Sequence, residues 1–258
     1  MCLVLVTTCT YVVQRAWFGD LDSAGDRPAV TLMRWMVASL VVVTAIVPTL
    51  GAALAPSAIP AKHELQSVQS EALAGISGSA MVTGRLIACL RPLWLILLIS
   101  AVLWTGVELH FSPLAYGTWV NVLEAHFVIL CELYAIAGIS VLASANIQGG
   151  RSWIRGPLVA LLTHIASILG LFLMNGWLVA SHNPVPLIRR LLLVNPITAV
   201  CTCLNFDLLR VNWVYGRTTA PEFDFKYPAP LASASVFMAL ALVSALAAGW
   251  VVGRSART

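Results

Sequence analysis

Charged side chains are scarce in this chain. Asp, Glu, Lys and Arg together make up 10% of its 258 residues, whereas a soluble domain usually carries about 25%. Apolar residues make up 59%. Because so little polar surface cannot coat a water-soluble globule of this length, the composition excludes an ordinary soluble domain and favours a protein embedded in lipid.

Basic clusters are also missing. Lys62 and Lys226 are the two lysines, no run of five or more basic residues occurs, and the net charge is only +4. This pattern excludes nucleic acid as a partner. Neither lysine follows a glycine, so the chain has no Gly-Lys pair of the kind that a phosphate-binding loop needs. We therefore expect no cofactor in this chain, and ATP would have to be bound by a separate subunit.

Motifs of catalytic and metal sites are absent as well. His63-Glu64 lacks the second histidine of a zinc-binding helix, and residues 75–78 read Gly-Ile-Ser-Gly, which is not the Gly-x-Ser-x-Gly nucleophile elbow. Cys201 and Cys203 stand too close together in sequence to pair readily. The sequence thus predicts neither a catalytic site nor a metal site.

Long apolar runs dominate the remainder of the chain. Since about 20 helical residues cross a bilayer, five runs can each span it; they cover residues 36 to 55, 92 to 110, 118 to 143, 157 to 181 and 230 to 252. A sixth, shorter run from Cys2 to about Phe18 is also predicted to span. Pro92 and Pro157 are expected to open their helices, where a missing N–H costs nothing.

The run from 191 to 209 is interrupted by polar residues. Asn195, Asn205 and Asp207 would be costly facing lipid, so this run is better interpreted as a re-entrant or interfacial piece buried against protein. The predicted fold is therefore all-α: one transmembrane domain, residues 1–258, with about six spanning helices and an extracellular or re-entrant segment, 182–229, before the last helix.

Positive charges orient such a bundle, because short cytoplasmic connections are rich in Lys and Arg. With six crossings, three basic regions fall on one side: the connection 56–91, the connection 144–156 and the tail with Arg254 and Arg257. This predicts that both termini face the cytoplasm; we expect an integral protein of a bacterial inner (plasma) membrane. The five basic residues within 182–229 would then lie outside, against the charge rule, so charge counting alone leaves the path of residues 191–209 open.

Three stretches carry a resemblance to a known family. They are His63 to Leu73 with Val82 to Ala88 and Leu90 to Leu93, then Ile139 to Ser144 with Arg151-Ser152, and finally Val194 to Val200 with Phe206 to Arg210. Together with six spans and a long second connection, they resemble the type-2 permeases of ATP-binding-cassette exporters. The likeness covers about residues 36 to 252.

The resemblance implies that this chain forms the membrane pathway and that a separate subunit binds ATP. The region 56–91 would be a cytoplasmic coupling loop that contacts a separate ATPase subunit, in which ATP and Mg are bound; its contact residues would be Glu64, Gln66, Gln69, Glu71 and Arg85. Two permeases, as a homodimer or a heterodimer, would form the pathway through the lipid bilayer. The alternative is an amphipathic loop that is merely solvated. The extracellular segment of the family corresponds here to Asn195, Pro196, Asp207 and Arg210.

Polar residues also lie within the predicted spans. Asn121, Glu124 and Glu132 are spaced to share one helix face, and carboxyl groups at that depth normally face a bundle interior or a cavity. They are candidates for a substrate path or a proton-sensitive site; the alternatives are a structural partnership with Arg or backbone groups, and a neutral protonated carboxyl. His126 and His164 are interpreted as satisfied interior or interfacial residues.

Two other classes of protein fit the same composition. One is a membrane-embedded enzyme that acts on lipid-linked substrates, with Glu124, Glu132, Asp207 or His182 as acid or base. The other is a structural anchor subunit of a larger membrane complex. The leading hypothesis is the permease subunit of an ATP-driven exporter, which would not itself be an enzyme.

Overall fold

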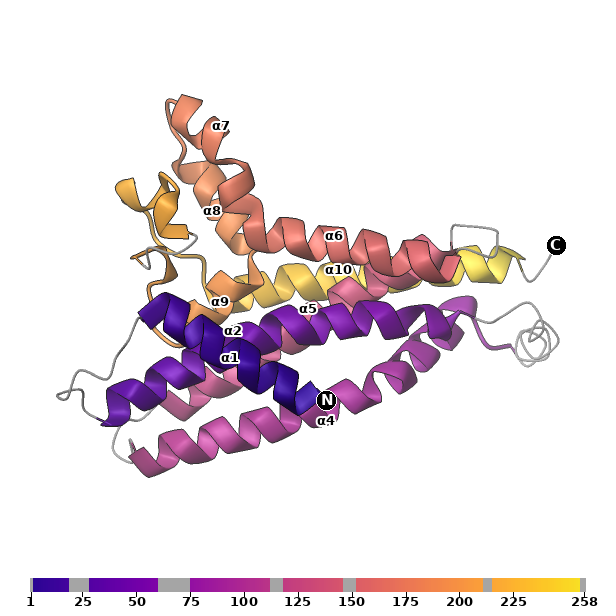
Figure 1. Ribbon diagram of the computed structural model, residues 1–258. Helices are drawn as coiled ribbons and strands as arrows, with labels where there is room; N and C mark the ends of the chain where they lie inside the picture. The colour runs from indigo at the N-terminus through magenta and orange to yellow at the C-terminus, as the bar shows by residue number, and fades with distance from the viewer. Residues whose placement is uncertain are drawn as a thin grey trace. The chain divides into compact units, whose positions relative to one another are not determined.

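Helices form every regular element that the computed structural model describes (Figure 1). It describes residues 2–18, 28–59, 75–111, 118–145, 152–210 and 215–255. Five helices are long and apolar enough to cross a membrane: α2 (Pro28–Leu54), α4 (Gly78–Phe111), α5 (Thr118–Ala145), α6 (Ser152–Leu173) and α10 (Pro230–Ser255). The predicted all-α membrane helix bundle is confirmed.

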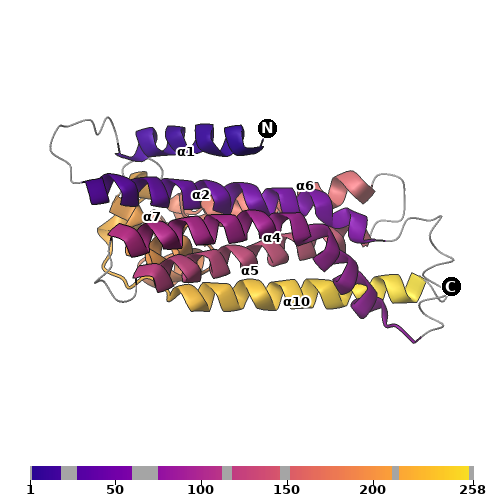
Figure 2. The ribbon, with the colours of Figure 1, turned by 90° about the horizontal axis from the view of Figure 1, so that it is seen from below.

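Shorter helices complete the described part. They are α1 (Cys2–Phe18), α7 (Asn175–Ala180), α8 (Val185–Leu193) and α9 (Pro196–Cys203), with 3-10 turns η1 (Ala55–Ala58), η3 (Leu208–Arg210), η4 (Tyr215–Arg217) and η5 (Ala220–Glu222). α1 has 17 residues; it crosses α2 at an angle in Figure 1 and lies along one side of it in Figure 2. The rings of Tyr11 and Trp35 lie 6.4 Å apart between the two helices.

The outer helices display large apolar side chains. α2 and α5 are mostly buried, whereas α4, α6 and α10 are mostly exposed. Ile99 of α4, Leu162 of α6 and Val243 of α10 each leave more than half of their side chain uncovered, at 66%, 58% and 63%. Exposed apolar surface on three long helices is more stable in contact with lipid hydrocarbon than with water. The chain is an integral membrane protein.

Two compact units divide the chain, and each of the five long helices contributes residues to both. Unit 1 comprises Met1–Ile46, Leu98–Ile129 and Ala166–Ala234, and unit 2 comprises Val47–Leu97, Leu130–Ile165 and Ser235–Thr258. Of the described residues, unit 2 therefore holds both ends of the 56–91 connection, residues 56–59 and 75–91, together with the end of α5, the start of α6 and the C-terminal end of α10. Unit 1 holds α1 and the entire 182–229 segment.

Within unit 2, α5 is the central helix. A Cβ added to Gly51 of α2 would stand 2.3 Å from a methyl group of Leu133, and Ser140 Oγ donates a 2.7 Å hydrogen bond to the Ala52 carbonyl, also on α2. On the α4 side, the rings of Trp94 and Tyr134 lie 6.1 Å apart. These contacts fix α5 against both preceding long helices.

Small residues allow α6 and α10 to pack closely against α5. A Cβ added to Gly156 of α6 would stand 1.8 Å from Ser144 Oγ of α5, and one added to Gly138 of α5 would stand 3.1 Å from Ser244 Cβ of α10. Close approach through Gly and Ser is the usual way in which helices associate where lipid supplies no hydrophobic driving force. α5 thus contacts all four other long helices of this unit.

The start of α4 crosses the end of α10 (Figure 2). A Cβ added to Gly249 would stand 2.3 Å from Ser79 Cα, and one added to Gly78 would stand 2.4 Å from the Gly249 carbonyl oxygen. The backbones themselves touch here. The end of the 56–91 connection and the C-terminal helix are therefore neighbours within unit 2.

Two helix starts differ from the prediction. Pro92 and Pro157 lie inside α4 and α6, which begin at Gly78 and Ser152, so neither proline opens its helix. A proline removes one backbone hydrogen bond, whereas ending a helix in lipid would leave several backbone groups unpaired, and the helix therefore continues. Consequently residues 78–91 of the predicted loop are the first turns of α4. Pro230 does open α10.

Candidate functional site

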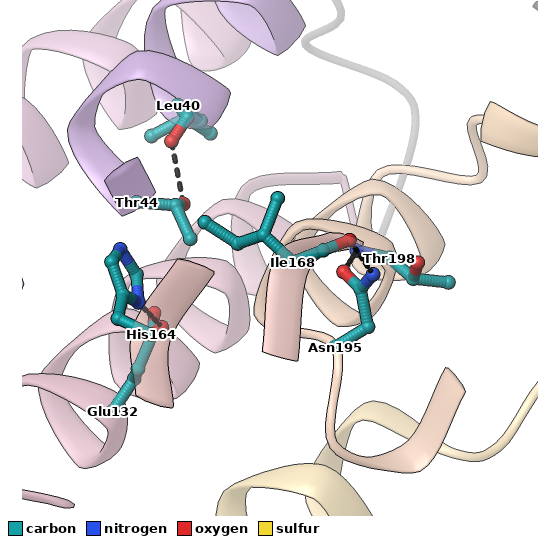
Figure 3. A network of polar contacts seen from close by, with 7 residues as sticks. All are labelled: Leu40, Thr44, Glu132, His164, Ile168, Asn195 and Thr198. Atoms are coloured by element: carbon teal, nitrogen blue, oxygen red, sulfur yellow. Dashed lines mark hydrogen bonds and ion pairs between the residues drawn. The ribbon is translucent and has the colours of Figure 1, made fainter. Parts of the chain in front are cut away.

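A carboxyl and an imidazole meet between α5 and α6 in unit 2. His164 Nδ1 lies 2.8 Å from Glu132 Oε1, and the two side chains are only 2% and 1% exposed (Figure 3). Glu132 was predicted as a residue of the pathway or of a proton-sensitive site, and His164 as an interior residue. Their pairing was not predicted.

Helix geometry explains the meeting. Glu132 lies near the middle of α5 and His164 near the middle of α6. Gly156, together with Ser140 and Ser144, allows the two helices to approach closely. Two consecutive helices joined by a short connection pack antiparallel, so residues at similar distances from that connection face each other. In the sequence, Glu132 and His164 stand at similar distances from the connection between α5 and α6, and this spacing could have predicted the pair.

The pair does not exhaust the hydrogen-bonding capacity of the carboxyl. At 2.8 Å, the contact between Nδ1 and Oε1 is as close as an ion pair, yet it lacks the angle of a well-aligned hydrogen bond. Oε2 of Glu132 has no hydrogen-bond partner in the described part of the chain. Glu132 is therefore a buried carboxyl in close contact with a histidine, with a second oxygen that accepts no hydrogen bond from the described residues.

Three further polar residues of α5, Asn121, Glu124 and His126, lie in unit 1. Asn121 and Glu124 are half-buried, whereas His126 is buried. The His126 ring contacts the Val122 carbonyl through Nδ1 at 2.7 Å and Ser100 Oγ of α4 through Nε2 at 3.0 Å. The prediction that His126 is a satisfied interior residue is confirmed, and this histidine ties α5 to α4.

Asn195 organises the segment that the sequence singled out as interrupted. Its Oδ1 accepts the Thr198 backbone N–H at 3.0 Å and so caps α9, while Nδ2 donates to the Ile168 carbonyl of α6 at 2.8 Å (Figure 3) and to the Tyr215 hydroxyl at 2.9 Å. Pro196 occupies the first turn, where a missing N–H costs nothing. Tyr215 also donates to the Ile168 carbonyl.

α8 and α9 meet at a break of 86°, so residues 191–209 do not form one straight helix. α9 is almost wholly buried, from Pro196 to Cys203, as the prediction of a piece buried against protein requires. α8 is amphipathic: Ile188 and Leu192 are buried, whereas Arg189 and Arg190 face outward. At the break, the Asn195 side chain binds the Thr198 backbone N–H and the Ile168 carbonyl.

Asp207 anchors the end of this segment. Its Oδ1 accepts the Leu209 backbone N–H at 3.2 Å and the Tyr227 hydroxyl. Burial, together with the hydrogen bond to Asp207, raises the pKa of Tyr227. Burial likewise raises the pKa of Tyr215, the partner of Asn195. Both tyrosines therefore act as neutral hydrogen-bond donors that hold the segment together.

The predicted coupling residues are only partly described. Glu64, Gln66, Gln69 and Glu71 lie outside the described residues. Arg85 lies on the first part of α4 and is half-buried. Arg210 ends η3. The structure thus brings together Glu132 with His164, and Asn195 with Tyr215, whereas Asp207 binds Tyr227 separately.

No family model, curated protein or solved structure matches this chain. The class that the fold defines is a polytopic all-α integral membrane protein.

Proposed function

We propose that this chain is the membrane-spanning permease subunit of an ATP-driven exporter, and that a separate ATPase subunit supplies the energy. The bundle provides the pathway, and the connection 56–91 meets the ATPase on the cytoplasmic side. Two permease subunits line one pathway. Residues 182–229 form the extracellular segment, with α8 and α9 as its re-entrant hairpin.

The observation that carries this proposal is the contact between the start of α4 and the end of α10. Ser79 and Gly78 touch Gly249 through the backbone, so the end of the 56–91 connection and the C-terminal helix belong to one packed layer within unit 2. Arg85 and Arg91 on α4 and Arg254 on α10 add positive charge to that unit, which favours a cytoplasmic position for it. A soluble ATPase could reach the connection there.

Because α5 is central in unit 2, a movement of the 56–91 connection can be passed through it to the other long helices. A force applied to the connection acts on α4, which contacts α5 through Trp94 and Tyr134, and α5 in turn contacts α2, α6 and α10 in the same unit. Movement of one helix therefore reaches the whole unit without unfolding any element, as a rocking mechanism requires.

A pull-down tests the proposal. The tagged chain, purified from its native membranes in mild detergent, is expected to retain an ATPase. The variant Glu64→Ala with Glu71→Ala should retain about tenfold less, which corresponds to about 1.4 kcal/mol of binding free energy. Quantitative mass spectrometry of the retained ATPase is the measurement.

Glu222→Ala is the matched control, since it removes an exposed carboxyl from the 182–229 segment; it should retain as much ATPase as the unchanged protein. Recovery of the unchanged protein with no ATPase would contradict the proposal. Equal retention by the double variant would show that the connection is not the contact.

A further inference from the structure

The C-terminal end of α6 reaches the edge of the lipid layer. α6 has 22 residues, so at a rise of 1.5 Å per residue it is about 33 Å long, slightly more than the hydrocarbon thickness of a bilayer, which is about 30 Å. α7 and α8 follow this end of α6 (Figure 1) and belong to unit 1. The chain therefore arrives at the boundary between lipid and water where α7 begins.

α7 exposes an aromatic ring at this boundary. Trp177 is 74% exposed and Val179 65%, and Leu173 at the end of α6 is 59% exposed, whereas Leu178 is buried. A tryptophan on a membrane protein favours the headgroup level, where its ring meets the upper part of the acyl chains. α7 therefore contacts lipid through Trp177 and its apolar neighbours.

α8 is fixed against the same end of α6. A Cβ added to Gly170 would stand 3.5 Å from a methyl group of Leu191, which is an ordinary van der Waals contact. Ile188 and Leu192 are buried. One side of α8 is therefore packed against protein, and its other side points outward in a fixed direction.

That outward side carries positive charge. Arg189 and Arg190 are both exposed. No residue between Glu132 and Asp207 is acidic, and in the described part of the chain no acidic side chain forms an ion pair with either arginine. A guanidinium binds a phosphate through two N–H donors at once. A basic, amphipathic helix at a membrane boundary is complementary to anionic headgroups.

We propose that α7 and α8 form a binding surface for an anionic phospholipid, on which Arg189 and Arg190 bind the headgroup phosphate and Trp177 contacts the acyl chains close to the glycerol. The apolar exposure of α7 selects a lipid, because a free phosphate has no chains to contact it. The surface gives a role to two of the five basic residues of the 182–229 segment. It does not depend on what the chain transports.

Native mass spectrometry of the purified full-length chain tests the selectivity. In micelles with equal amounts of anionic dioleoylphosphatidylglycerol and zwitterionic dioleoylphosphatidylcholine, the chain should retain about fivefold or more of the anionic lipid, since one basic residue near an anionic surface strengthens the attraction about fivefold. Arg189→Gln with Arg190→Gln should bring the ratio of the two bound lipids close to one. Equal retention of both lipids by the unchanged protein would overturn the proposal.

Arg217→Gln with Lys226→Gln is the matched control, because it removes two other exposed basic residues from the same segment. It should keep the ratio of the unchanged protein. Arg189→Lys with Arg190→Lys keeps both charges and should keep most of the ratio, and circular dichroism establishes that each variant is folded. An equal loss in the two glutamine variants would overturn the proposal, because any exposed charge would then serve.

Fluorescence quenching in nanodiscs tests the position of Trp177. The difference between the unchanged protein and Trp177→Phe isolates the emission of this residue. Phosphatidylglycerol with bromine near the glycerol end of its acyl chains should quench that emission more than the lipid with bromine near the methyl end. The reverse order, or no quenching by either lipid, would overturn the proposal.

Both experiments use the purified chain without a partner subunit, and nanodiscs present the same lipid on both faces. Loss of ATPase binding in the pull-down would leave their outcomes unchanged, so this inference and the proposed function can fail separately.

Discussion

Gly249→Leu should destabilise the protein severely. A Cβ at this position would stand 2.3 Å from Ser79 Cα and 2.6 Å from Ser79 N, and backbone atoms cannot rotate away as a flexible side chain can. Overpacking of a close contact costs about 1–3 kcal/mol or more, and here two helices must move apart. The expected result is a lower midpoint of thermal unfolding for the purified protein, measured by fluorescence in detergent.

Gly106→Leu is the matched control. Gly106 also lies in a long helix, but nothing stands within 4 Å of an added Cβ, so a leucine there faces open space and should change the unfolding midpoint little. If Gly249→Leu unfolded at the same temperature as Gly106→Leu, α4 and α10 would not touch as described. The support for placing the 56–91 connection beside the C-terminal helix would then be lost.

Glu132→Leu and His164→Leu should each destabilise the chain as single changes. Each removes one member of the buried pair, so the other loses the close contact between Glu132 Oε1 and His164 Nδ1. Leaving a buried polar group unsatisfied costs about 1–3 kcal/mol. Unfolding in a chemical denaturant, followed by tryptophan fluorescence, measures how much the free energy of unfolding falls in each variant.

The double variant Glu132→Leu with His164→Leu should recover part of the lost stability, because neither member of the pair is then left buried against a leucine. A double-mutant cycle measures the coupling between the two residues. Thr163→Leu, at an exposed position beside His164, is the control for a new leucine on α6. Strictly additive losses would show that Glu132 and His164 do not act as a pair.

Much of the fold could be predicted because its determinants are local. The five long apolar runs correspond to α2, α4, α5, α6 and α10. The polar residues within 191–209 predicted a re-entrant or interfacial piece, and the structure has a break of 86° there, where the Asn195 side chain caps α9. Helix starts were less accurate: Pro92 and Pro157 were expected in the first turn of their helices, but they lie inside α4 and α6, because the backbone must stay paired in lipid.

The partners of the polar residues could not be predicted in the same way. Pairing between helices depends on which faces meet, and that is decided by close contacts such as Gly156 against Ser144. The Glu132 carboxyl was expected to face the bundle interior because it would be costly in contact with lipid. Its neighbour His164 was interpreted only as a satisfied interior or interfacial residue. Tyr215, which supports Asn195 from 20 positions away, carries no local signal at all.

Labelling of introduced cysteines tests the central claim most directly. In a variant without its six native cysteines, Gln69→Cys, Asp224→Cys and Arg257→Cys are made one at a time and exposed to a membrane-impermeant maleimide, on intact cells and on permeabilised cells. We expect position 224 to react on intact cells, and positions 69 and 257 to react only after permeabilisation. Reaction of position 69 on intact cells would contradict the account, because no cytoplasmic ATPase could then reach the 56–91 connection.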